Sequence, residues 1–191
     1  YPGTYPANDP GLGGNTDLPE VINYSAGIYQ DTVDWDPNWV YFDALEDRLN
    51  ILNTVSAGNC GIATPSFTNC ADGPHRVSTP TTQYNVVSVG GLQSSTTYPD
   101  TSGYAPWPNS SPGPTWGGRK KPDVIAPVFG TSGTPSAIDD TTWTSAGGDG
   151  TSFAAPVAAG GALLLASSGV YAPTAQKAIM INSTTPVQGQ T

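Results

Sequence analysis

Short apolar runs rich in β-branched residues recur along the chain, and each is bounded by Gly, Pro or Asn. Runs of this length without polar alternation are typical of strands that are buried on both faces of a sheet. Between the first two runs, Tyr41, Leu45 and Leu49 recur at helical spacing among acidic residues, which predicts an amphipathic helix over residues 39–50. The predicted strands cover residues 21–23, 51–57, 85–89 and 124–126.

This order of elements predicts an α/β fold. A strand, a helix and a second strand form a βαβ unit, and its parallel strands need helices on both faces of the sheet. Residues 152–167 are rich in Ala and Leu with almost no polar side chain, which predicts a helix buried on all sides. We expect a last helix from residue 173 or 174 to about 181, with Thr174 as its candidate cap. The Pro- and Gly-rich residues 100–121 should form a surface loop.

Composition and charge narrow the class of protein. The 191 residues are enough for one domain, which we take as residues 1–191, and 23 Gly with 19 Pro indicate many turns and long loops. The formal charge of −9 repels nucleic acid and anionic membranes, so we expect neither as a partner. We also expect no membrane span, because no window approaches the roughly 18 apolar residues that one requires.

The two cysteines, Cys60 and Cys70, lie ten positions apart around Gly61 and Pro65. This spacing fits a small loop closed by a disulfide, which would place the protein in an oxidising, secreted or extracytoplasmic compartment. Two free thiols are the alternative interpretation.

One serine lies where a nucleophile could be activated. Ser152 follows a small Gly150-Thr151 turn at the start of the Ala-rich helix, where free backbone N–H groups and the helix dipole favour a developing negative charge. Its own N–H could help to hold an oxyanion. A serine in this position is usually a simple helix cap, and the residues alone leave both interpretations open.

The motif around Ser152 resembles the nucleophile motif of the subtilisin-like serine proteases, the subtilases of peptidase family S8. Four further segments resemble parts of the same family in the same order, so that the resemblance spans roughly residues 20–185. The five segments are residues 21–27 (VINYSAG), 56–59 (SAGN), 85–91 (NVVSVGG), 117–127 (GGRKKPDVIAP) and 150–156 (GTSFAAP).

The resemblance implies a partial subtilisin-like fold, a doubly wound parallel sheet with a buried helix starting at the nucleophile. It also implies a serine endopeptidase that acts on peptide or protein substrates and requires no cofactor. Ser152 would be the nucleophile and Asn59 the oxyanion-hole donor. The small residues of the substrate-binding walls suggest a cleft open to large side chains. These walls would be formed by Ser25, Ala26 and Gly27 on one side and by Ala57 and Gly58 on the other.

The Asp and His of a subtilase triad have no match in this sequence. The family places them upstream of the segment similar to residues 21–27, and the single histidine, His75, follows Asn59 in a loop. A serine without a base is a poor nucleophile, and loss of the His in subtilisin itself costs about a million-fold in turnover. We therefore expect this chain alone to be nearly inactive.

Three explanations stay open at this point. The chain is a segment of a longer enzyme, one of two chains of a cleaved enzyme, or a degenerate subtilase-fold module that binds peptide or protein. In the first two, an N-terminal remainder supplies the Asp and His as a partner. The acidic residues 31–36, with Asp139 and Asp140, offer either a structural calcium site or solvated surface charge, and their spacing favours the latter.

Overall fold

The structure is a computed structural model of the chain, and it describes residues 19–29, 35–61, 70, 77–95, 99–135 and 143–187. Within these residues the main sheet has five strands, of which β1, β2, β3 and β5 run parallel, and β4 pairs antiparallel with the end of β3. The prediction of about four parallel core strands is thus confirmed. The strands are β1 (Val21–Tyr24), β2 (Leu52–Ser56), β3 (Val87–Ser94), β4 (Tyr104–Pro106) and β5 (Val124–Pro127).

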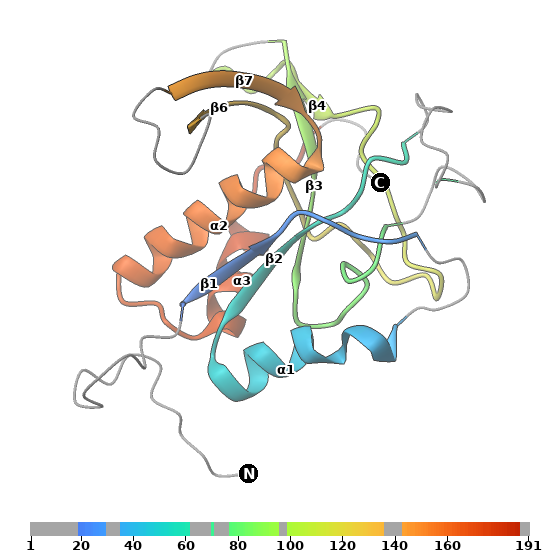
Figure 1. Cartoon of the computed structure of the whole chain (residues 1–191), viewed down its shortest axis with the longest axis vertical. Helices are drawn as coiled ribbons and strands as arrows, with labels where there is room; N and C mark the ends of the chain where they lie inside the picture. The colour runs from blue at the N-terminus through green and yellow to red at the C-terminus, as the bar shows by residue number, and fades with distance from the viewer. Residues whose placement is uncertain are drawn as a thin grey trace.

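Two helices cover one face of this sheet. Helix α2 (Thr151–Ser167) packs across β1, β2, β3 and β5, and α3 (Pro173–Ser183) packs beside it (Figure 1). The alanines of α2 allow the helix to lie close to the strands, because Ala154, Ala158 and Ala162 are all buried there. The rest of this core consists of Leu52, Val87, Val89, Trp107, Val124, Ala126, Val128 and Ala155.

The opposite face is covered by a 3-10 turn, η1 (Pro37–Trp39), and by α1 (Val40–Leu49). Phe42 packs there on Val55 and Val86. The two faces of the sheet thus contribute side chains to two separate hydrophobic cores. The helix was predicted, but not its buried face: Phe42 and Glu46 are buried, whereas Tyr41 is 47% exposed. The predicted apolar face is therefore rotated by about one residue.

Helix α2 is buried on one side and bare on the other. It begins at Thr151, one residue before Ser152, after Gly150. Its inner alanines face the sheet, whereas Val157, Leu163 and Leu164 are 52%, 48% and 71% exposed. Among the described residues, nothing covers this apolar surface, so the prediction of burial on all sides holds for the inner face alone.

Three further details differ from the sequence prediction. An antiparallel hairpin of β6 (Phe129–Pro135) and β7 (Trp143–Asp149) was not predicted, and the short strand β4 lies inside the expected loop. The residue before α3 is Ala172 with Pro173 at the first helical position, so Thr174 is not the cap. No helix in the part of the chain that the structure describes has the length and apolar character needed to cross a bilayer.

Candidate active site

Three segments that are distant in sequence meet at the carboxyl edge of the parallel strands. Ser25, Ala26 and Gly27 directly follow β1, and Ala57, Gly58 and Asn59 directly follow β2. Helix α2 starts at the same edge, because Thr151 contacts both Gly58 and Asn59 through hydrogen bonds. The structure thus brings together the nucleophile motif and both of the segments that the sequence singled out.

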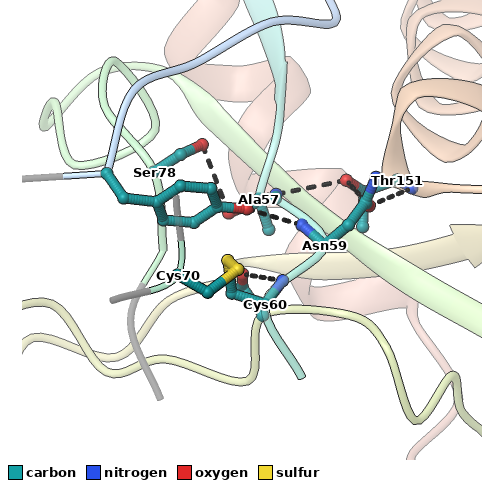
Figure 2. Close-up of a disulfide and its surroundings, with 9 residues drawn as sticks. Ala57, Asn59, Cys60, Cys70, Ser78 and Thr151 are labelled. Carbon is teal, nitrogen blue, oxygen red and sulfur yellow. Dashed lines mark hydrogen bonds between the residues drawn. A yellow bond between two sulfur atoms is a disulfide. The ribbon is translucent and has the colours of Figure 1, made fainter. Parts of the chain in front are cut away.

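The carboxamide of Asn59 is held in one orientation by Thr151. The backbone N–H and the hydroxyl of Thr151 both donate to Oδ1 of Asn59, at 3.0 and 2.8 Å, and Figure 2 shows this side chain turned toward Thr151. A backbone N–H can only donate, so the amide oxygen has to face Thr151. The Nδ2 donor is consequently directed to the other side of the carboxamide.

Gly150 lies beside both potential oxyanion donors. A Cβ built on Gly150 would be 3.3 Å from Nδ2 of Asn59 and 3.8 Å from the backbone nitrogen of Ser152. The φ angle of Gly150 is 146°, a conformation that residues with a side chain rarely adopt. Both donors therefore lie within 4 Å of the position that a side chain at residue 150 would occupy.

The hydroxyl of Ser152 is oriented by the segment after β1. Its Oγ donates to the carbonyl oxygen of Ser25 at 3.2 Å, and Oγ of Ser25 donates back to the carbonyl oxygen of Ser152 at 3.0 Å. Nδ2 of Asn23 in turn donates to Oγ of Ser25 at 3.0 Å. This reciprocal pair ties the first turn of α2 to the end of β1.

Two glycines of the predicted substrate-binding walls are in close contact with other side chains of this chain. A Cβ on Gly27 would overlap the side chain of Ser78, and a Cβ on Gly58 would overlap the hydroxyl of Tyr29. Both glycines are therefore packed against neighbouring side chains. This packing is sufficient to explain their small size, and the width of the cleft stays a prediction.

The loop beyond Asn59 is closed by a disulfide. Cys60 is bonded to Cys70, as the spacing predicted (Figure 2). The N–H of Cys60 donates to Oγ of Ser111 at 3.1 Å, and Cys60 itself is buried. The chain directly after the oxyanion-hole candidate is therefore anchored by a covalent bond and by a hydrogen bond.

The Lys-Pro-Asp part of the resembling segment directly precedes β5 and contacts the start of β3. Nζ of Lys121 donates to Oδ2 of Asp123 at 2.6 Å and to the carbonyl oxygen of Val86 at 3.0 Å. Oδ2 of Asp123 also accepts from the N–H of Ser88 at 2.8 Å. Burial lowers the pKa of Lys121 to about 8, although Asp123 opposes this change. This part of the motif joins β3 to β5, and its side-chain hydrogen bonds and ion pairs within the described residues do not involve Ser152.

A buried carboxyl lies near this ionic group. Glu46 of α1 is buried, and Oε2 has no hydrogen-bond partner. Burial raises the pKa of Glu46 to about 7, and Lys177 of α3 opposes this most strongly. This carboxyl therefore keeps its proton to a higher pH than an exposed glutamate does.

Several sequence predictions fall outside the described residues: His75, residues 31–34, Asp139 and Asp140. Within the described residues, no three His, Cys, Asp or Glu side chains gather as a metal site would require. Calcium binding by the acidic loops stays a prediction. Sequence reasoning also missed Tyr29, whose hydroxyl accepts from the N–H of Asn59 at 2.7 Å, because an isolated tyrosine in a loop carries no sequence signal.

Comparison with known proteins identifies the family. The model of the subtilase family, Peptidase_S8, matches residues 13–191, which is most of the chain. The chain belongs to the subtilase family. Its mixed, mostly parallel sheet with helices on both faces is accordingly a partial subtilisin-like α/β fold. No curated protein matches this subtilase chain.

Solved structures show the same fold. The prenylagaramide maturation protease PagA is 23% identical with a TM-score of 0.64, over 88% of this chain and 53% of its own. The PatG macrocyclase in complex with peptide is 16% identical with a TM-score of 0.62, over 88% and 44%. Proteases from Pseudoalteromonas arctica are 18% identical with a TM-score of 0.61, over 94% and 48%. This subtilase chain spans about half the length of the solved structures that it matches.

Proposed function

We propose that this chain is the nucleophile-bearing part of a serine endopeptidase, in which Ser152 attacks the peptide bond and Asn59 stabilises the oxyanion. The observation that carries the proposal is the fixed orientation of the Asn59 carboxamide. Its oxygen accepts hydrogen bonds from two donors of Thr151. Its nitrogen lies beside Gly150, the residue that precedes α2. A noncatalytic module has no need of a donor that is oriented in this way next to a serine.

In the proposed reaction, Oγ of Ser152 forms a bond to the carbonyl carbon of the substrate, and its proton passes to a histidine base. The carbonyl electron pair moves onto oxygen, and Nδ2 of Asn59 with the N–H of Ser152 donates to this oxyanion. The C–N bond then breaks, the amine leaves with the proton, and an acyl-enzyme remains on Ser152. Water, activated by the same base, releases the acid and restores the hydroxyl. All of these groups are protein groups, so hydrolysis requires no cofactor.

The base and its Asp would come from an N-terminal remainder, in the same precursor or in a second chain. Three observations support this part of the proposal. The chain covers about half of the solved structures it resembles. Within the described strands, β1 pairs with β2 on one edge and with no strand on the other. Val157, Leu163 and Leu164 of α2 expose an apolar surface, which the remainder would cover.

The substrate would be a peptide or a protein, in a secreted or extracytoplasmic setting. A parallel is the solved PatG structure, which contains a peptide. The Cys60–Cys70 disulfide favours an oxidising compartment. The net charge of −9 disfavours nucleic acid as a substrate or partner.

The test is labelling with a fluorophosphonate probe, which reacts with activated serines. In the longer protein or the two-chain form, we expect Ser152 to be labelled rapidly, and the Ser152→Ala variant to be unlabelled. This chain alone should be labelled slowly or not at all. An unreactive Ser152 in the assembled protein would favour a noncatalytic binding module, and rapid labelling of this chain alone would contradict the need for an external base.

A further inference from the structure

Tyr29 directly follows a residue that is fixed to a neighbouring segment. The preceding residue, Ile28, forms an isolated antiparallel bridge with Thr79, in which the two backbone N–H groups donate to the opposite carbonyl oxygens at 3.0 and 2.8 Å. The hydroxyl of Thr79 adds a third hydrogen bond to the carbonyl oxygen of Ile28, at 2.9 Å. The neighbouring Ser78 is tied in turn to Ala57 at the end of β2, by its N–H at 2.9 Å. The backbone from which the Tyr29 side chain extends is thus anchored to the segment that leads from β2 to Asn59.

The phenol oxygen of Tyr29 supplies an acceptor where the sheet can no longer do so. The N–H of Ala57 still donates to β3, at Val89, but the chain then leaves the sheet at Gly58, whose φ is 106°. The N–H of Gly58 donates to Thr151, and that of Asn59 donates to the hydroxyl oxygen of Tyr29 at 2.7 Å. A Cβ on Gly58 would overlap this hydroxyl, so the glycine and the tyrosine fit each other.

Asn59 is consequently held from two directions. Thr151 accepts from the N–H of Gly58 at 3.1 Å and holds the carboxamide oxygen of Asn59. Tyr29 holds the backbone of Asn59 from the segment after β1. A carboxamide can bind a developing oxyanion well only if both its rotamer and its backbone are fixed beforehand, because reorganisation during the reaction costs free energy.

We infer that Tyr29 is a positioning residue for the oxyanion hole, and that it acts through Asn59 without touching the substrate's reacting atoms. This inference rests on the proposed function. The phenol oxygen sets the position of the Asn59 backbone, and the side-chain nitrogen of Asn59 transmits that position to the oxyanion. The contribution of Tyr29 is therefore expected in turnover and not in substrate affinity.

The test is a double-mutant cycle in the assembled enzyme with Tyr29→Phe and Asn59→Ala. Tyr29→Phe keeps the ring and removes the acceptor, and loss of one hydrogen bond of ordinary strength predicts a fall in kcat of about 3- to 10-fold, with KM unchanged. In the Asn59→Ala background, Tyr29→Phe should cause no further loss. Tyr171→Phe, at an exposed tyrosine in the turn between α2 and α3, is the matched control and should retain full kcat.

The thermal unfolding midpoint of each variant shows how much stability it loses, which distinguishes a positioning role of Tyr29 from a general loss of structure. The rate at which a fluorophosphonate modifies Ser152 gives a second readout, which should fall in parallel with kcat. An unchanged kcat in Tyr29→Phe, or an equal loss in both backgrounds, would overturn the inference. If Asn59→Ala itself leaves kcat unchanged, the proposed function fails first, and the inference fails with it.

Discussion

Replacement of Gly150 by alanine is the sharpest test of the geometry around the oxyanion hole. The substitution adds a single methyl group, at a position where it would be 3.3 Å from Nδ2 and 3.7 Å from Oδ1 of Asn59. The carboxamide is restrained by two hydrogen bonds to Thr151, so it cannot move away without weakening them. We expect Asn59 to be displaced by a few tenths of an ångström from the position that binds the oxyanion.

Two separate costs follow from this substitution. The φ angle of 146° is unfavourable for a residue with a side chain, which predicts a loss of about 1–3 kcal/mol in the free energy of unfolding. Displacement of the carboxamide predicts a fall in kcat of about 10-fold or more. Complete loss of this donor sets the upper limit, and in subtilisin itself that loss costs about 100- to 1,000-fold. KM should change little, because the donor acts in the transition state.

Gly118→Ala separates the two costs. Gly118 also has a positive φ, 83°, but a Cβ there would meet nothing within 4 Å. It should lose stability through backbone strain while kcat is retained. The assay is kcat and KM on a peptide substrate, with urea unfolding of both variants. If Gly150→Ala loses stability as Gly118→Ala does but keeps full kcat, the assignment of Asn59 to the oxyanion hole is wrong.

Three further outcomes are expected. Because the folded-state pKa of Glu46 is raised to about 7, the native state binds the extra proton and stability should fall as pH rises from about 4.5 to 7. In urea unfolding, Glu46→Gln should make this decline in the free energy of unfolding smaller by about 1–3 kcal/mol. Asp47→Asn, at an exposed neighbouring residue, should leave the decline unchanged. Reduction of the Cys60–Cys70 disulfide should lower the free energy of unfolding by up to about 3 kcal/mol, and an unchanged urea midpoint would show that the loop is held by other contacts. Leu164→Glu should weaken association with the N-terminal remainder by at least about 10-fold in a binding titration, and unaltered affinity would show that this face of α2 is not covered by it.

Elements with an unambiguous hydrophobic pattern were predictable from the sequence. The run at residues 51–57 contains Ile51, Leu52 and Val55 and is bounded by Asn50 and Gly58, and β2 is found there. The hairpin of β6 and β7 was not predictable, because residues 129–135 contain two Gly and a terminal Pro, which normally interrupt strands. Its pairing depends on a partner strand that the local sequence does not reveal.

The error in the predicted face of α1 also arises from contacts with distant parts of the chain. Glu46 reads as a solvent-facing residue of an amphipathic helix, yet it is buried near Lys177 of α3. Phe42 packs on Val55 and Val86, and Glu46 lies one helical turn after Phe42 on the same face, so the buried face excludes Tyr41. In the candidate site, the motifs located Ser152 and Asn59, but not the contact of Tyr29 with Asn59, since that contact exists only after the chain has folded.

The bare side of α2 has a consequence for control of the enzyme. Under the proposed function, the same helix carries the serine at its first turn and an unprotected apolar surface along its outer side. Docking of the missing half would shield this surface and deliver the base to the serine in a single step. Association of the two halves would then activate the protease, so that each half by itself would be inactive without any inhibitor.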